Sequence, residues 1–393
     1  MLDTGSVDCS VPLNGVFGIV VARPSRKGDQ VRTFRVALTG DFLNEDGRPA
    51  YGDAVISLLA REPAIAYHFL SGQAPRRGDP DSLRRLYSFE VTPEQIAEVE
   101  GVVVLRPWVK QSAFARGAVN LVVIGRSGAG YDKVDLAACT NNDVAVYNAP
   151  LALNHSTAST ALLFMLALAK RLPDQERIVR EGQWERQAQV MGSELKGRTL
   201  GVVGLGHSGR ELVRLVAPFM MRIIAHSPHA EAADAESLGV KLTTLEEVFR
   251  ESDFVSLHRR LNESTRRAIG AQLLRLMKPS AYFINVARGE LVDQTALTEL
   301  LRQRRIAGAA LDVFEVEPLP LNDPLLALDN VILTPHWSAS TSDVWKATGM
   351  AMGQGMIRAA QGLVPDHVVN AEVLERPGFQ AKLARFRENG AGA

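Results

Sequence analysis

Three ionisable residues in the second half of the chain have the types needed for acid–base catalysis. Arg288 follows the apolar run FINVA, Glu317 follows LDVFEV, and His336 follows ILTP. Open α/β sheets bind ligands beyond the carboxyl ends of their strands, so we expect the three side chains to lie together. A guanidinium can hold a carboxylate, an imidazole can exchange a proton, and a carboxylate can orient and charge that imidazole. The set predicts chemistry on an anionic carbonyl compound, completed by a hydride-transferring nicotinamide.

Each of these residues also has a purely structural explanation when it is taken alone. Arg288 could cap a helix or form an ion pair, Glu317 could be an exposed loop acid, and His336 could be a hydrogen-bonded histidine. Their shared position at one edge of one sheet favours the functional interpretation.

A glycine-rich turn precedes this set in the sequence. Gly204, Gly206 and Gly209 form a GxGxxG pattern between the apolar run TLGVV and a helical pattern. In such turns the first glycine permits the bend, the second lets a pyrophosphate approach the backbone, and the third allows close helix packing. The turn predicts a dinucleotide site at a helix N-terminus.

The remaining pattern indicates the elements that position these residues. Apolar runs separated by helical patterns are typical of parallel βαβ units covered by helices on both faces. The expected strands are FRVALTG, GVVVL, LVVIG, VAVYNAP, TLGVVGL, RIIAHS, DFVSLH, AYFINVA, AGAALDV and NVILTPH. Helices are expected over Tyr51–Arg61, over an apolar Thr157–Arg171 and over Thr341–Gln361, followed by a short polar tail.

Composition narrows the class of protein. The 44 basic residues balance 44 acidic ones, hydrophobic residues make up 46% and charged residues 22%. This excludes wholesale disorder and gives no global attraction to nucleic acid or to a membrane surface. The apolar run Ala161–Ala169 is too short to span a bilayer, and Cys9 and Cys139 form no disulfide framework or metal site. We therefore expect a cytoplasmic protein without a bound metal.

The choice between NAD and NADP is left open by the sequence. Ser227 occupies the place of the acidic residue that usually binds the adenosine ribose. Loss of a carboxylate there removes repulsion toward a 2′-phosphate. Arg259 and Arg260 could attract such a phosphate, or they could be solvated loop charges.

The motifs together resemble the D-isomer-specific 2-hydroxyacid dehydrogenase family, and most closely its phosphoglycerate dehydrogenase-like branch. The resemblance rests on IGRSGAGYDKVD, GVVGLGHSG, FINVARGELVD, ALDVFEVEPLP and TPHWSAST, and covers residues 34–370. It implies that Arg288 binds and polarises a 2-oxo acid, that His336 donates the proton, and that Glu317 supports His336. These three are the expected catalytic residues.

The resemblance also implies binding residues on both sides of the site. The substrate carboxylate is expected at the backbone of Ser127, Gly128, Ala129 and Gly130, with Arg106 as a candidate for a second anionic group. The expected cofactor-binding residues are Gly204, Gly206, His207, Ser208, Gly209, Ser227, Val286, Ala287 and Asp312.

The implied fold is α/β, with two Rossmann-like or flavodoxin-like doubly wound domains and the cofactor domain inserted into the substrate domain. The substrate domain is expected over residues 33–150 and 337–393, the cofactor domain over 151–336, and an N-terminal extension over 1–32. The helix around Thr157–Arg171 and the arm after it resemble the family's dimerisation region.

The predicted function is therefore an NAD(P)-dependent oxidoreductase that interconverts a D-2-hydroxy acid and its 2-oxo acid. Glyoxylate, hydroxypyruvate and 3-phosphoglycerate chemistry are all compatible with the motifs. The alternative is a corepressor-type binding protein of the same superfamily, which keeps the fold and a nucleotide site but acts through partners.

Overall fold

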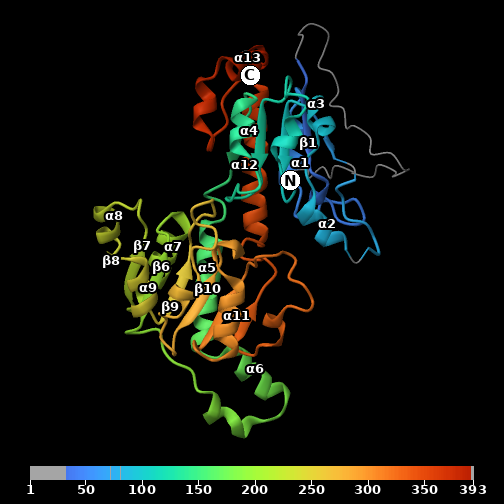
Figure 1. Ribbon diagram of the computed structural model, residues 1–393. Coiled ribbons are helices and arrows are strands. Elements are labelled where there is room, and N and C mark those ends of the chain that lie inside the picture. The colour runs from blue at the N-terminus through green and yellow to red at the C-terminus, as the bar shows by residue number, and fades with distance from the viewer. Residues whose placement is uncertain (1–31, 71, 80, 391–393) are drawn as a thin grey trace, which may run out of the picture.

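The computed structural model describes residues 32–70, 72–79 and 81–390, which form two parallel sheets (Figure 1). The expected extension over 1–32 lies outside this part of the chain, apart from Arg32. Within the described residues, no helix combines the length and the apolar character needed to cross a bilayer.

The first sheet is wholly parallel and has the strand order β2-β1-β3-β4-β5. Its strands are β1 Phe34–Leu38, β2 Ile65–Phe69, β3 Gly101–Val104, β4 Val123–Arg126 and β5 Ala145–Asn148. Helices α1 Ala54–Arg61 and α12 Ser342–Ala360 bury one face, and α3 Pro93–Ala97 and α4 Leu136–Asn141 bury the other. The short helix α2 Ser82–Ser88 precedes β3.

The second sheet is also parallel, with the order β12-β11-β10-β9-β6-β7-β8. Its strands are β6 Thr199–Val203, β7 Arg222–His226, β8 Val240–Leu242, β9 Phe254–Leu257, β10 Tyr282–Asn285, β11 Gly308–Leu311 and β12 Val331–Leu333. The order reverses at β6, as in dinucleotide-binding folds, and this reversal places the ligand site at the carboxyl ends of β6 and β9.

Helices cover both faces of the second sheet because most of its strand residues are apolar and buried. One face packs against α5 Asn154–Ala169, α7 His207–Val216 and α8 Ala232–Ser237. The other packs against α9 Leu245–Glu251, α10 Ala271–Leu274 and α11 Gln294–Arg302. Helix α6 Leu172–Arg180 extends away from this layer at the bottom of Figure 1.

The chain returns to the first sheet after the second one is complete. In Figure 1 the red α12 lies beside the blue and cyan N-terminal strands, and Met352 and Met356 of α12 are buried in the core of the first sheet. The expected α/β class, with one doubly wound unit inserted into another, is confirmed by this topology.

The expected polar tail is wrong, because the chain forms further helices after residue 370. Helices α13 Pro377–Ala384 and α14 Arg387–Gly390 follow α12. Phe379, Leu383 and Phe386 are buried in the core of the first sheet. The spacing of these three apolar residues is that of a helix face, and the polar residues between them hid it.

Candidate active site

His336 and Glu317 form a hydrogen-bonded pair beyond the second sheet. Nδ1 of His336 lies 2.9 Å from Oε2 of Glu317, and Oε1 of Glu317 accepts the Phe314 N–H at 3.1 Å. Burial raises the pKa of Glu317, but these two hydrogen bonds and the positive charge of a protonated His336 outweigh it, so its pKa lies below the ordinary value. The carboxylate stays ionised at neutral pH, and Nε2 of His336 remains available for proton exchange.

Asp312 holds the backbone that carries His336. It follows β11, it is fully buried, and its carboxylate accepts hydrogen bonds from the Thr334 hydroxyl and from the N–H groups of Trp337 and Ser338 at 2.6–2.9 Å. Its backbone oxygen accepts the His336 N–H at 2.7 Å. His336 itself has φ +53°, an uncommon value that this surrounding framework fixes.

Arg288 follows β10 and reaches the loop that follows β4. Its Nε and one Nη lie 3.1 and 3.0 Å from Oδ1 of Asp132, and its other Nη donates to the Ala287 carbonyl at 2.8 Å. Asn285 supports the turn, since its side chain donates to the Arg288 carbonyl and accepts the Ala287 N–H. The guanidinium is therefore held by two loops, one that follows β4 of the first sheet and one that follows β10 of the second.

The loop after β4 presents free backbone amides next to Arg288. Within the described part of the chain, the N–H groups of Gly128, Ala129 and Gly130 donate to no protein acceptor, whereas the Ser127 N–H donates to the Val104 carbonyl at 2.8 Å. Gly128 has φ +137°, and a Cβ on Gly130 would collide with the Arg288 guanidinium. Successive free N–H groups beside a guanidinium make a concavity suited to a carboxylate.

The glycine turn has the shape that a dinucleotide requires. Gly204 has φ +100°, and a Cβ there would lie 2.8 Å from the backbone of His258 and Arg259. A Cβ on Gly209 would collide with the Gly204 carbonyl, while one on Gly206 would meet only open space. Gly206 caps α7, so the open space lies over a helix N-terminus and fits a pyrophosphate.

Ser208 in this turn is held by a buried histidine. His258 hydrogen-bonds the Ser208 hydroxyl through Nδ1 at 3.1 Å and the Ser256 hydroxyl through Nε2 at 2.9 Å. Burial lowers the pKa of His258 to about 4. The imidazole is therefore neutral, with one donor and one acceptor nitrogen, and it holds the Ser208 hydroxyl in one orientation. His207 is exposed at the start of α7.

The other expected cofactor residues lie at the same sheet edge. Ser227 follows β7 and is partly exposed, Val286 is buried, and Ala287 is partly buried after β10. Arg260 instead stacks over the ring of Tyr131, in the loop after β4, at 5.1 Å from the ring centroid. Its guanidinium thus faces the first sheet's loop.

Arg106 lies after β3 in a surrounding that already balances its charge. One Nη donates to the Tyr51 hydroxyl at 2.6 Å, and the other lies 3.5 Å from Oδ2 of the buried Asp41. Burial lowers the pKa of Arg106, but Tyr51 and Asp41 outweigh burial and leave it above the ordinary value.

Sequence reasoning missed several residues that shape the site, among them Asp132, Lys133, His258 and Asn285. The strand-end position of Asn285, directly before the expected Val286 and Ala287, was a usable signal. Asp132 and Lys133 belong to the motif IGRSGAGYDKVD, but no regular spacing of residues marks either of them as part of a site. Among the described residues, no group of three or more His, Cys, Asp or Glu side chains is arranged to hold a metal ion.

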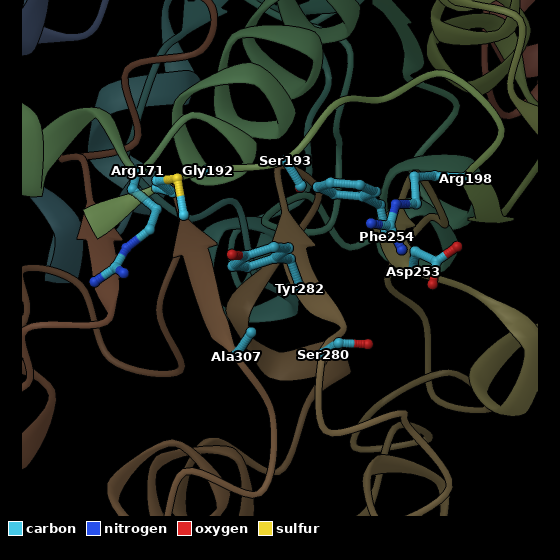
Figure 2. Close-up of a pocket in the computed structure, with 10 residues that line it drawn as sticks. Arg171, Gly192, Ser193, Arg198, Asp253, Phe254, Ser280, Tyr282 and Ala307 are labelled. Atoms are coloured by element: carbon cyan, nitrogen blue, oxygen red, sulfur yellow. The ribbon is translucent and has the colours of Figure 1, made fainter. Parts of the chain in front are cut away.

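A pocket at the opposite edge of the second sheet is separate from this site. Phe254 and Tyr282 begin β9 and β10 and line it together with Arg171, Gly192 and Ala307 (Figure 2). The glycine turn, Arg288 and Asp312 all lie at the carboxyl ends of the strands. The pocket therefore takes no part in the arrangement described above.

Comparison with known proteins agrees with this geometry. Residues 162–338 match the model of the D-isomer specific 2-hydroxyacid dehydrogenase, NAD binding domain. A glyoxylate reductase from Korarchaeum cryptofilum is 36% identical over 75% of this chain and 90% of its own length. A D-3-phosphoglycerate dehydrogenase from Archaeoglobus fulgidus is 37% identical over 73% of this chain and 54% of its own length. The crystal structure of a glyoxylate reductase from Paecilomyes thermophila, 26% identical, superposes with a TM-score of 0.70 over 83% of this chain and 95% of that one.

The fold and the glycine turn define a two-sheet protein of the dinucleotide-binding dehydrogenase class. More narrowly, the chain belongs to the D-isomer specific 2-hydroxyacid dehydrogenase family. It spans about half the length of the D-3-phosphoglycerate dehydrogenases that it matches.

Proposed function

We propose that this protein is an NAD(P)-dependent oxidoreductase that interconverts a D-2-hydroxy acid and its 2-oxo acid. The observation that carries the proposal is that Arg288 lies beside the free amides of Gly128 to Gly130 and close enough to the Glu317–His336 pair for its charge to act on Glu317. Named relatives are reductases and dehydrogenases of such acids. No observation favours the corepressor-type alternative.

Each group has a distinct task in this proposal. The amides of Gly128, Ala129 and Gly130 bind the carboxylate, and Arg288 binds the 2-oxo group and polarises it. His336 gives a proton from Nε2 to the carbonyl oxygen during reduction and takes it back during oxidation, while Glu317 stabilises the imidazolium. When bound, the nicotinamide supplies or accepts the hydride.

The residues that would hold the dinucleotide are those of the glycine turn and the neighbouring strand ends. Gly204, Gly206 and Gly209 would give the pyrophosphate room, and Ser208, fixed by His258, would hydrogen-bond it. Ser227 would lie beside the adenosine ribose, and Val286 and Ala287 beside the nicotinamide. Asp312 keeps its expected place near the nicotinamide in this proposal, in addition to its support of the His336 loop.

The organisation we propose is a substrate unit over residues 33–150 and 337–393 and a cofactor unit over 151–336. The Arg288–Asp132 ion pair and the Arg260–Tyr131 stacking join the two units at the site.

We also propose a homodimer formed through α5, α6 and the following arm, because this region exposes large apolar side chains. They are Leu163, Leu172, Val179, Trp184 and Met191. The free and buried thiol of Cys139 suits a reducing compartment such as the cytoplasm.

An activity screen tests the function directly. The purified protein is assayed with glyoxylate, hydroxypyruvate, 3-phosphohydroxypyruvate and oxaloacetate, each with NADH and with NADPH. Oxidation of the reduced cofactor by at least one acid, lost in His336→Ala, is the expected result. If no acid is reduced with either cofactor while both cofactors bind, the protein is a dinucleotide-binding protein of another function.

A further inference from the structure

Lys133 is a cation beside the site, close enough to Arg288 and Glu317 to feel their charges. It follows Asp132 in the segment between β4 and α4, and its Nζ lies 4.9 Å from the ring centroid of Tyr87 and 5.3 Å from that of Trp108. In the described part of the chain, its ammonium donates one long hydrogen bond, 3.5 Å, to the Tyr87 carbonyl. Across the described residues, no Asp or Glu forms an ion pair with it. The ammonium lies against the rings of Tyr87 and Trp108, and N–H groups remain on it that can donate to a ligand.

The carboxylates near Lys133 are already engaged with other groups. Asp132 pairs with Arg288 at 3.0 Å, and Glu317 pairs with His336 at 2.9 Å. The buried Asp41 accepts the backbone N–H of Arg106 at 2.9 Å, and its Oδ2 lies 3.5 Å from the Arg106 guanidinium. These pairings leave Lys133 as a positive charge without a dedicated counter-charge.

A second cation, Arg126, ends β4 and forms no ion pair in the described part of the chain, although Asp132 lies near it. Its guanidinium donates to the Ser127 carbonyl, and its Nε is buried without a hydrogen-bond partner in the described structure. Burial lowers the pKa of Lys133, and the positive charges of Arg126 and Arg288 lower it further, to about 8 despite Glu317 and Asp132. An anion bound here would relieve the repulsion among these cations.

We propose that Lys133 binds a second anionic group on the substrate, at the end of the 2-oxo acid opposite its carboxylate. Tyr87 and Trp108 form the wall that holds the ammonium in place. The inference rests on the proposed function and names its substrate class, 2-oxo acids that carry a distal carboxylate or phosphate. Lys133 is then a specificity-determining residue, while carboxylate docking and proton transfer are left to Arg288, the loop amides and His336.

The test compares an acid with one anionic group, glyoxylate, with acids that carry two anionic groups, oxaloacetate and 3-phosphohydroxypyruvate, and the latter two are called dianionic acids for that reason. The variant is Lys133→Met, which keeps the approximate length of the side chain and removes its charge. Lys110→Met is the matched control, because Lys110 also lies over Trp108, 5.5 Å from its ring centroid, but is exposed and paired with Glu90. For 3-phosphohydroxypyruvate or oxaloacetate, kcat/KM should fall about tenfold or more in Lys133→Met, mainly through KM, as expected for loss of a charge-assisted bond. For glyoxylate, kcat/KM should change by less than about twofold.

The outcomes separate this inference from the proposed function. Equal losses for glyoxylate and for the dianionic acids, or a wild type that reduces glyoxylate but no dianionic acid, would overturn the role of Lys133. A larger loss for the phosphate ester than for oxaloacetate would identify phosphate as the distal group, and the reverse would identify a carboxylate. If the wild type reduces no acid at all, the proposed function fails. Calorimetric binding of dianionic and monoanionic acids then tests Lys133 by itself, and equal affinities in wild type and Lys133→Met would overturn it.

A pH series gives a second readout of the same charge. The preference of the wild type for a dianionic over a monoanionic acid should fall as the pH rises through about 8, because the Lys133 ammonium then loses its proton. The ratio of the two kcat/KM values cancels any titration that affects both substrates equally. The charged groups around Lys133 are Arg126, Asp132, Arg288 and Glu317, and Tyr87 packs against its ammonium. The pKa values of Asp132 and Glu317 lie below the ordinary carboxyl value and that of Arg126 is about 10, so these three groups stay charged near pH 8. Burial raises the pKa of Tyr87, so its hydroxyl stays neutral there. A ratio that follows the same curve in Lys133→Met would contradict the assignment.

Discussion

The Arg288 guanidinium and the Asp132 carboxylate form an ion pair of 3.0 Å that joins the loop after β10 to the loop after β4. Asp132 also lies near the buried Arg126, so one carboxylate balances two cations. Burial raises the pKa of Asp132, but the positive charges of Arg288 and Arg126 outweigh burial and leave it below the ordinary value. This pair fixes the guanidinium that we propose binds the substrate.

Replacing Asp132 by Asn should destabilise the protein by about 1–3 kcal/mol, because Arg288 and Arg126 then face each other without a counter-charge. The pKa of Asp132 is depressed in the folded state, so its contribution is present at neutral pH and is lost as the pH falls through the folded-state value. The difference in free energy of unfolding between wild type and Asp132→Asn should therefore shrink below pH 4, roughly the ordinary carboxyl range. Urea titrations at neutral and acidic pH measure it. A difference that does not change with pH would argue against the ion pair as its source.

Removing the imidazole should separate catalysis from cofactor binding. In His336→Ala we expect turnover to fall about 10²–10⁴-fold, the usual contribution of a positioned general acid. The dissociation constants of NADH and NADPH should stay within about twofold, because His336 lies outside the glycine turn. Steady-state kinetics and fluorescence titration of the cofactor check the two parts. Undiminished turnover would exclude His336 as the proton donor.

The sequence was sufficient to predict elements whose signal is local. Apolar runs marked most strands, and the ends of β10, β11 and β12 brought Arg288, Glu317 and His336 to one edge. The role of Asp132 could not be read in this way, because it depends on how the loop after β4 meets the loop after β10. The same holds for Lys133, whose aromatic partner Tyr87 comes from α2 and has no fixed spacing to it. Such contacts arise from tertiary packing between two sheets.

Two glycines of one turn should respond differently to the same added methyl group. Gly206→Ala should leave the melting temperature nearly unchanged, since a Cβ there meets only open space. It should weaken dinucleotide binding, because we propose that the pyrophosphate approaches the N-terminus of α7 through that space. Gly204→Ala should lower stability by more than about 1 kcal/mol, because it combines φ +100° with backbone contact at 2.8 Å. Thermal unfolding without cofactor and calorimetric titration with NADH distinguish the two cases. An unaltered affinity for NADH in Gly206→Ala would rule out the proposed pyrophosphate site at the N-terminus of α7.

The exposed arm after α5 should control the oligomeric state. Trp184 is 66% exposed and lies in the 3₁₀ segment Trp184–Val190, next to α6 with its exposed Leu172 and Val179. Trp184→Glu should turn the proposed homodimer into a monomer, because a charge would be buried in an apolar interface. Val119→Glu is the matched control, since Val119 is 76% exposed on the first sheet's side of the molecule, away from the arm. Light scattering after gel filtration gives the mass of each variant. A wild type that runs as a monomer, or a Trp184→Glu variant that keeps the mass of a dimer, would show that this arm is not the interface.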